Sequence, residues 1–262
     1  MAKVRVIILR TAGTNCDKET SFAFELAGAR TELAHINELV LGKKDLNAYH
    51  IIALPGGFTY GDDISSGKIL ANELKFKLGD DLKKFISDGK LIIGICNGFQ
   101  VMVKSGILPN LSGKFDASET TLTLNDSAKF EDRWAYLKIS DTGCIWTRDI
   151  NGIIRLPVAH GEGKFIPKNN GILKSLKRAG MIALKYVDEN GIEKGYPYNP
   201  NGSVENIAGI CDKTGRIFGL MPHPERHVSF YQGPDWTNLD SKPEGDGLRI
   251  FKNGVNFAKK NL

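Results

Sequence analysis

Short apolar runs and longer mixed segments alternate along the first half of this chain. Segments of helix length, from Asn15 to Leu26 and from Asn72 to Ile86, separate the runs. The strand-like runs are VRVIIL (4–9), TELAHI (31–36), IIALP (51–55) and LIIGI (91–95). Near-continuous apolar runs of this kind are typical of parallel strands covered by helices on both sides. This half therefore predicts a three-layer α/β fold with a doubly wound, mainly parallel sheet.

From about residue 118 the strand-like segments become shorter and more variable. They are TLTLN (121–125), WAYLKI (134–139), IIRLPVAH (153–160), MIALKYV (181–187), NIAGIC (206–211) and RIFGLMP (216–222). Helices are expected at 172–178 and from about 247 to 259. The change predicts short antiparallel additions to the same domain. Because neither a linker nor an internal repeat interrupts the pattern, we expect a single domain over residues 1–262.

Two segments, 190–203 and 231–247, are predicted to be long loops because they are rich in glycine, proline, asparagine and aspartate. Loops of this length in a compact domain are often functional or mobile. They are also compatible with ordinary surface loops, and the sequence leaves both interpretations open.

Composition and charge narrow the class of protein. The chain has 262 residues, of which 41% are hydrophobic, and its net charge is +5 from 35 basic and 30 acidic residues. Charges of both signs are mixed, as in residues 75–84, which indicates a solvated surface rather than a nucleic-acid site. The longest apolar stretch, 91–103, is shorter than the ~20 residues of a membrane span, and the first residues do not resemble a secretory signal. We expect a cytoplasmic enzyme with no nucleic-acid or membrane partner.

The four cysteines are Cys16, Cys96, Cys144 and Cys211, and they lie far apart with no CxxC pair. This spacing argues against a zinc site and against a disulfide scaffold. We therefore expect free thiols and no metal site, with Cys144 and Cys211 serving as small residues in or near strands.

Cys96 lies where an apolar strand ends, in the sequence GICNG (94–98). A helix that begins at Asn97 would make this a nucleophile elbow, the thiol version of the G-x-S-x-G turn of hydrolases. Gly94 and Gly98 would relieve crowding between strand and helix, and the positive end of the helix dipole would favour a thiolate. Taken alone, the pattern fits a nucleophile and a tight turn in the core equally well.

A cysteine nucleophile needs an imidazole to move protons and a carboxylate to orient the imidazole. The strand-like run RIFGLM delivers His223 at its end, and Glu225 follows two residues later. In an extended segment these two side chains would face one site. The ends of both strands would bring Cys96 and His223 to the carboxyl edge of the sheet, where doubly wound folds place their sites. The alternative is that His223 is a solvent-exposed turn residue.

Backbone N–H groups are needed to stabilise an oxyanion. The loop PGGF (55–58) directly follows a predicted strand, so Gly57 could supply one N–H and Asn97 the other. A plain strand-to-helix turn is the alternative for the two glycines.

Taken in order, these motifs resemble the class I (triad) glutamine amidotransferases, which have a flavodoxin-like fold. The broad resemblance is carried by PGGF (55–58), GICNGFQ (94–100) and MPHPER (221–226). A narrower one, to the glutaminase subunits of phosphoribosylformylglycinamidine synthases in purine biosynthesis, covers nearly the whole chain. Its motifs are GTNCD (13–17), GGFTYGD (56–62), CNGFQ (96–100), PVAHGEGKF (157–165), NPNGS (199–203) and DGL (246–248).

The resemblance implies hydrolysis of L-glutamine through a cysteinyl thioester. It makes Cys96 the nucleophile, His223 the general acid and base, and Glu225 the carboxylate that orients His223. Gly57 and Asn97 would be the oxyanion donors. The remaining residues, which would hold the substrate glutamine, are Gln100, His160 and Gly161, although His160 could equally be structural or face a partner.

The resemblance also implies partners. Ammonia would pass to a large synthetase subunit, with a small accessory subunit in the complex, and ATP and Mg²⁺ would be used there. This chain would need no cofactor of its own. The sequence agrees, because its Gly-Lys pairs at 113–114 and 163–164 are each followed by phenylalanine, where a P-loop needs serine or threonine.

Some features remain open beside this resemblance. Cys16 lies in the first strand-to-helix loop and has no candidate imidazole of its own, so we expect a packing or loop-shaping role rather than a second nucleophile. The loop GDDISSGKIL (61–70) and Thr11-Ala12-Gly13 depart from the usual family pattern, which bears on the surface that faces the partner. The alternatives are a catalytically silent scaffold or a related cysteine hydrolase of the same fold. Such hydrolases place their histidine directly after the nucleophile, where this chain has Asn97.

Overall fold

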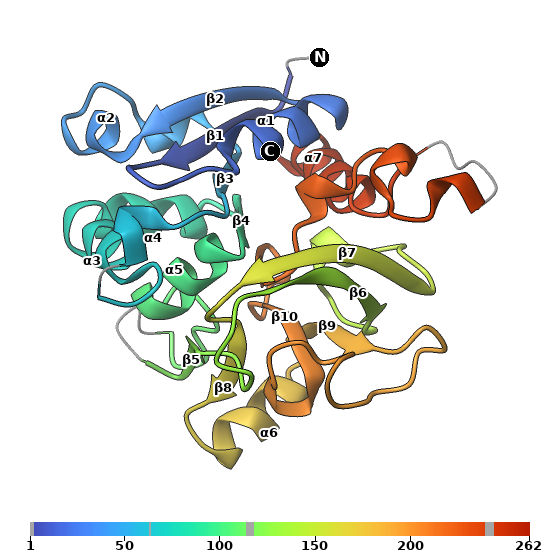
Figure 1. Cartoon of the computed structure of the whole chain (residues 1–262). Helices are drawn as coiled ribbons and strands as arrows, with labels where there is room; N and C mark the ends of the chain where they lie inside the picture. Colours follow the sequence, from blue (N-terminus) through green and yellow to red (C-terminus); the bar gives the residue numbers. More distant parts are fainter. Residues whose placement is uncertain (1–2, 63, 114–117, 239–243) are drawn as a thin grey trace.

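The computed structural model describes residues 3–62, 64–113, 118–238 and 244–262. A nine-stranded sheet with the order β2-β1-β3-β4-β11-β10-β9-β6-β7 runs through the molecule (Figure 1). Its strands are β1 (Arg5–Arg10), β2 (Arg30–His35), β3 (Ile51–Leu54), β4 (Leu91–Ile95), β6 (Glu131–Ile139), β7 (Ile153–His160), β9 (Ile182–Val187), β10 (Ile207–Cys211) and β11 (Ile217–Leu220). A separate antiparallel pair joins β5 (Thr120–Thr123) to β8 (Lys164–Pro167).

The five strands β2, β1, β3, β4 and β11 are parallel to one another. Every residue of β3, β4 and β11 is buried, because helices cover both faces of this half. In the register of β4 and β11, Ile95 pairs with Leu220, so both strands end at the same level. The predicted α/β fold with a parallel sheet is confirmed, and β4 has the predicted bounds.

Beyond β11 the sheet continues with β10, β9, β6 and β7, which are antiparallel. The predicted antiparallel additions are therefore present, and β6, with nine residues, is the longest strand in the part of the chain that the structure describes. The run TLTLN (121–125) belongs to β5, outside the main sheet. Sequence reasoning missed its partner β8, whose four residues, KFIP, carry too short a pattern to stand out.

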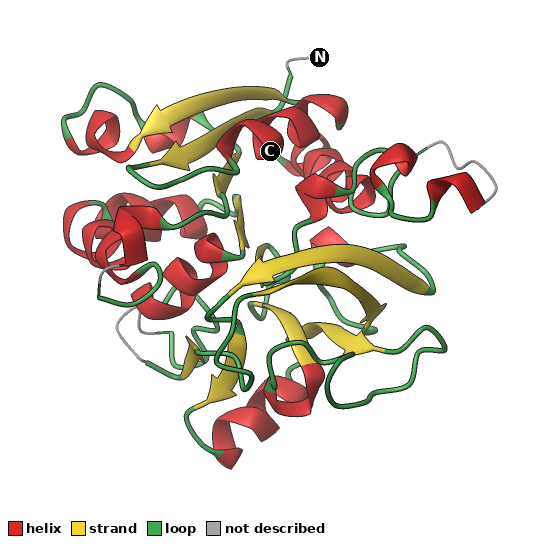
Figure 2. Ribbon diagram, in the orientation of Figure 1, coloured by secondary structure: helices red, strands yellow, loops and turns green. Residues whose placement is uncertain are grey.

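Helices lie on both sides of the parallel strands (Figure 2). Their bounds are α1 (Asp17–Leu26), α2 (Ile36–Val40), α3 (Lys68–Lys77), α4 (Gly79–Ser87), α5 (Asn97–Ser105), α6 (Asn170–Arg178) and α7 (Leu248–Asn261). On one side, Phe24 of α1 packs edge-on against Phe251 of α7, with ring centroids 4.9 Å apart. On the other, α5 packs against β3, β4 and β11, and α3 packs against α5.

One predicted helix is two helices in the structure. The segment 72–86 is divided between α3 and α4, and Leu78 joins them with a backbone φ of −126° that is not helical. The apolar spacing is nearly continuous across this break, so the pattern alone does not reveal it. Within the described residues, no helix has both the length and the apolar character needed to cross a membrane.

Candidate active site

Cys96 is the single residue between β4 and α5, and its backbone is strained. Its φ and ψ are 49° and −105°, a positive φ that non-glycine residues rarely adopt. The backbone N–H of Cys96 donates to the carbonyl of Leu220 at 2.8 Å, which extends the pairing of β4 with β11. Strain of this kind at a strand-to-helix turn presents the side chain at the sheet edge, as in a nucleophile elbow. The predicted helix start at Asn97 is confirmed.

The two glycines of the elbow permit the close approach of helix and strand. A Cβ on Gly98 would lie 1.9 Å from the carbonyl oxygen of Leu54 in β3, and one on Gly94 would lie 2.3 Å from the Met102 sulfur of α5. Neither glycine has a positive φ, so the requirement is for space rather than for a special backbone conformation.

We expect Gly98→Ala to destabilise the protein by about 3 kcal/mol or more, because the added carbon collides with rigid backbone. In an unhindered helix the same change would be stabilising, since alanine is the better helix former. Gly79→Ala is the matched control, because a Cβ there meets no atom within 4 Å and Gly79 is also helical. Urea unfolding of both variants measures the difference, and equal stabilities would contradict the crowding argument.

His223 and Glu225 form a buried pair at the end of β11. The imidazole Nδ1 lies 2.6 Å from Glu225 Oε1, and each residue is only 2% exposed. The backbone N–H of His223 donates to the carbonyl of Pro157 at 2.8 Å, which fixes the ring relative to β7. The predicted pairing is present, but its predicted reason is wrong. Residues Pro224–Arg226 form a 3-10 turn, η5, rather than an extended segment, and the pair closes across that turn.

The electrostatics of this pair favour a charged imidazole. Burial by itself lowers the pKa of His223, but the Glu225 carboxylate and the Cys96 sulfur outweigh it and raise the pKa well above the ordinary value. Nε2 of His223 is buried and has no hydrogen-bond partner of good geometry among the described residues. The thiol of Cys96 is close enough to act on this imidazole electrostatically and also reaches the carbonyl of Ala159 at 3.7 Å. A thiol, an imidazole and a carboxylate therefore meet at one edge of the sheet.

The glycine loop after β3 lies against the imidazole. A Cβ on Gly56 would fall 2.7 Å from Cε1 of His223, so the loop touches the ring. Gly57 has a φ of 142° and forms an isolated antiparallel bridge with Thr14. Because a left-handed backbone there suits only glycine, Gly57 is structurally constrained at the position predicted for an oxyanion donor.

The side chain of Asn97 ties the elbow to this loop. Asn97 Oδ1 accepts from the Thr59 hydroxyl at 2.7 Å, and Asn97 Nδ2 donates to Gln100 Oε1 at 2.9 Å. Gln100 Nε2 in turn donates to the carbonyl of Glu162 at 2.5 Å. These bonds connect the glycine loop, the first turn of α5 and the loop after β7. Gln100 is thus placed beside the site, with its amide engaged by the protein itself.

Comparison with known proteins decides the family. A family model described as the CobB/CobQ-like glutamine amidotransferase domain matches residues 3–258. The phosphoribosylformylglycinamidine synthase subunit PurQ of Dehalococcoides mccartyi is 49% identical, across 99% of this chain and 100% of that protein. The chain belongs to the PurQ family. A PurQ of Methanococcus maripaludis is 44% identical over 98% of both chains. One chain of the PurLQS structure from Thermotoga maritima is 30% identical with a TM-score of 0.75, covering 98% of this chain and 99% of that one.

In this PurQ-family chain, His160 is buried within a network of amides. Asn125 Nδ2 donates to the backbone carbonyls of Lys129 and His160, so its Oδ1 is the acceptor for the His160 Nδ1–H at 3.2 Å. His160 Nε2 lies 3.5 Å from Asn201 Nδ2. Burial, together with the charge of His223, lowers the pKa of His160 to about 3. A neutral ring with both nitrogens engaged shows how the His160 side chain is held, and the predicted contact of its backbone with the substrate glutamine stays a prediction.

The pKa of His160 predicts a loss of stability in acid. Below pH ~6.5 the unfolded chain protonates this histidine and the fold does not, so the free energy of unfolding falls until about pH 3. At pH 4 the loss from this group is about 3 kcal/mol. We expect His160→Gln to flatten this part of the pH dependence, measured by urea unfolding of both proteins at pH 7 and pH 4. Parallel curves would show that His160 is protonated in the fold.

Sequence reasoning missed the residues that hold His160. Asn125 and Asn201 lie 35 and 41 positions from it along the chain, and the signal for Asn201 was its place in the motif NPNGS (199–203). The Asn201 amide oxygen accepts from the Ser203 hydroxyl at 2.7 Å, and Asn199 Nδ2 donates to the Ser203 carbonyl at 2.9 Å. The end of the predicted loop 190–203 is therefore a buried support of the site. Gly161 contributes its carbonyl, which accepts from the Asn125 backbone at 2.9 Å.

Cys16 lies beside the same imidazole as Cys96. Its sulfur is 4.0 Å from His223 Nδ1 and accepts from Arg226 Nη2 at 3.2 Å. The predicted reason for dismissing a special role, the lack of a neighbouring imidazole, is therefore wrong. The predicted packing role has support, since the Cys16 backbone N–H donates to the carbonyl of Gly56 at 3.2 Å. Burial raises the pKa of the Cys16 thiol, which keeps it protonated at neutral pH.

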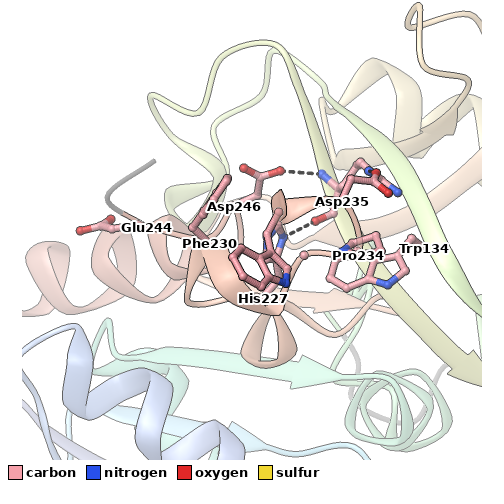
Figure 3. A pocket seen from close by; sticks show the side chains of 10 residues that line it. Trp134, His227, Phe230, Pro234, Asp235, Glu244 and Asp246 are labelled. Carbon is pink, nitrogen blue, oxygen red and sulfur yellow. Dashed lines mark hydrogen bonds and ion pairs between the residues drawn. The ribbon is translucent and has the colours of Figure 1, made fainter. Parts of the chain in front are cut away.

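A separate cavity of about 70 Å³ lies between β6, β7 and residues 227–236 and 244–246, with Trp134, His227, Phe230 and Glu244 in its wall (Figure 3). Arg155 spans this region, pairing with Asp235 at 2.5 Å while its backbone N–H donates to Asp246 at 2.9 Å. None of the predicted site residues is among the described residues that line it. At this cavity, the contacts of Arg155 with Asp235 and Asp246 join the loop to β7.

Three of the sequence predictions include residues outside the described part of the chain. They are residues 239–243 of the predicted loop 231–247, residue 63 of the loop 61–70, and Lys114.

Proposed function

We propose that this chain is the glutaminase subunit of phosphoribosylformylglycinamidine synthase, with Cys96, His223 and Glu225 as its catalytic residues. It hydrolyses L-glutamine and supplies ammonia to a large synthetase subunit, which converts formylglycinamide ribonucleotide to the amidine in purine biosynthesis. A small accessory subunit belongs to the same complex. Membership of the PurQ family and the likeness to a PurLQS chain support this assignment.

The residues suggest how the reaction proceeds. The Cys96 thiol gives its proton to Nε2 of His223, and its sulfur attacks the side-chain amide carbon of glutamine. The charge that develops on the amide oxygen is held by the N–H groups of Gly57 and Asn97. His223 gives its Nε2 proton to the leaving nitrogen. The bond between carbon and nitrogen breaks, ammonia departs, and the glutamyl group remains joined to Cys96 as a thioester. His223 then takes a proton from water, which attacks the thioester and releases glutamate. Glu225 holds the Nδ1–H throughout, so that Nε2 faces the reacting atoms.

The observation that supports this mechanism most is the state of the His223 ring. Its Nδ1 is bonded to a carboxylate, whereas its buried Nε2 has no hydrogen-bond partner of good geometry in the part of the chain that the structure describes, and the strained Cys96 is close enough to raise the pKa of the ring. An unsatisfied buried nitrogen costs free energy, so its retention calls for a functional explanation. A catalytically silent scaffold would have no use for this arrangement.

We further propose that this chain uses no cofactor and that ATP and Mg²⁺ act on the synthetase subunit. We propose a cytoplasmic location as well. Its support is chemical, since all four cysteines are free thiols, as is usual in a reducing compartment. We also keep Gln100 and the backbone around His160 and Gly161 as candidates for holding the substrate glutamine.

A glutamine analogue that alkylates thiols tests the assignment directly. We expect stoichiometric labelling at Cys96, located by peptide mass spectrometry, and protection by L-glutamine. Cys144 and Cys211 are internal controls, because both are buried away from the site. Labelling at Cys16 instead, or labelling that glutamine does not slow, would overturn the assignment of the nucleophile.

A further inference from the structure

The side chain of His223 forms a cluster with two others, and each of the three offers a different kind of metal-ligand atom. The Cys16 sulfur, a ring nitrogen of His223 and a carboxylate oxygen of Glu225 all lie within 4.8 Å of one another, and all three residues are buried. They come from the loop before α1 and from the turn after β11. The spacing argument against a metal site could not detect this cluster, because Cys16 and His223 are 207 positions apart.

A second observation points to a ligand at this place. Only one oxygen of the Glu225 carboxylate is engaged, by His223, while Oε2 is buried and has no hydrogen-bond donor among the described residues. The Glu225 side chain is 0% exposed. A buried carboxylate oxygen without a donor is costly, and the reaction proposed above uses only the other oxygen.

The donor set selects the kind of ion. One thiolate sulfur, one imidazole nitrogen and one carboxylate oxygen are the ligands that Zn²⁺ takes in proteins, whereas Mg²⁺ and Ca²⁺ take oxygen ligands. Tetrahedral zinc with bonds of about 2.0–2.3 Å needs its ligand atoms about 3.4 Å apart. The present distances of 2.6 Å between His223 and Glu225 and 4.0 Å between Cys16 and His223 bracket that spacing.

The surrounding charges allow a divalent cation. Arg226 approaches the Cys16 sulfur and would repel an ion, but its Nε is paired with Glu19 at 3.1 Å. With Cys16 as a thiolate, the charges of Cys16, Glu225, Glu19 and Arg226 sum to −2, which Zn²⁺ balances.

We propose that Cys16, His223 and Glu225 form an inhibitory site for Zn²⁺. On binding, the Cys16 thiol and the His223 Nδ1 each release one proton, and the metal replaces the hydrogen bond between His223 and Glu225. The imidazole then keeps its remaining hydrogen on Nε2, so that it cannot accept a proton from Cys96 or from water. The inhibition rests on the proposed function, whereas the binding does not.

Cobalt is the probe that separates this site from the nucleophile. Co²⁺ replaces Zn²⁺ in such sites and gives a thiolate-to-cobalt charge-transfer absorption when a cysteine is a ligand. We expect this absorption in the unaltered full-length chain and in Cys96→Ser, and expect Cys16→Ser to lose it and to bind Co²⁺ roughly 100-fold more weakly. Cys211→Ala is the control and should bind as the unaltered chain does. Circular dichroism of each variant verifies folding, and Cys96→Ser tests the site even if Cys16→Ser does not fold.

Glutaminase assays in the complex with the synthetase subunit test the consequence. We expect Zn²⁺ to inhibit the unaltered enzyme and to inhibit Cys16→Ser much less, with each protein compared with its own activity without metal. Absorption lost in Cys96→Ser but kept in Cys16→Ser would place the metal on the nucleophile and overturn the proposal. Metal binding at Cys16 in a chain with no glutaminase activity would instead count against the proposed function alone.

Discussion

We expect Cys96→Ser to abolish glutamine-dependent synthesis by the assembled complex, with a fall in kcat of about 10⁴-fold or more. A hydroxyl in this position is a far weaker nucleophile than a thiolate, and the imidazole–carboxylate pair opposite it cannot compensate. The substitution removes no packing volume of consequence, so the fold is expected to persist. Glutamate release from glutamine, measured with the purified complex, gives the result.

Supplying ammonium salts to the same variant is the control. If this chain only delivers ammonia, the synthetase subunit should form the amidine from added ammonia at the rate of the unaltered complex. Loss of both activities would mean that Cys96 holds the complex together. Retention of glutamine-dependent activity would remove Cys96 from the mechanism.

Glu225→Gln has the second-largest expected effect. An amide can hold the imidazole but cannot stabilise its charged form, and comparable substitutions of an orienting carboxylate lower kcat by about 10⁴-fold. The same carboxylate raises the pKa of His223 against the opposing effect of burial. Without this carboxylate the opposing effect of burial is less well balanced, so the pKa of His223 falls.

The expected signature is a shift in the pH profile. A protonated His223 persists above pH 6.5 in the unaltered chain because its pKa is raised, and this state is lost as the pH rises through that pKa. In Glu225→Gln the alkaline limit of kcat/KM should therefore move to lower pH. The double variant Glu225→Gln, Cys16→Ser separates the effect of the carboxylate from that of the neighbouring thiol. An unchanged alkaline limit would show that Glu225 does not set the protonation of His223.

Much of the fold could be predicted because strong patterns and tertiary packing agreed. The buried strand 91–95 and the strand–turn–helix at Cys96 are local features, and a continuous apolar run followed by Gly-Ile-Cys-Asn-Gly predicts both. The boundary between α3 and α4 could not be seen, since Leu78 is apolar and buried at the same four-residue spacing as Leu74 and Leu82, and only its backbone departs from a helix. The strand β8 was missed because four residues carry little periodicity.

In the candidate site, too, residues with a local sequence signal could be predicted, whereas residues brought in by loop packing could not. Cys96 and His223 could be proposed because each follows an apolar run, and parallel strands bring such ends together. Glu225 could be proposed because it follows His223 by two residues. The residues that contact them in the structure could not be proposed from the sequence. Cys16 reaches His223 only through the bridge between two loops, and Asn125 reaches His160 from outside the main sheet. Contacts of this kind depend on how loops fold over one another, which no repeat in the chain encodes.

The insertion of β11 between β4 and β10 has a consequence for biosynthesis on the ribosome. Until residues 217–220 have been made and have emerged, β4 and β10 each present an unpaired edge, and the imidazole lies on polypeptide that has not yet joined the sheet. With His223 in the catalytic role proposed above, we expect no turnover of glutamine by a nascent chain until β11 has joined the sheet. The same exposed edges make truncated products candidates for aggregation and degradation.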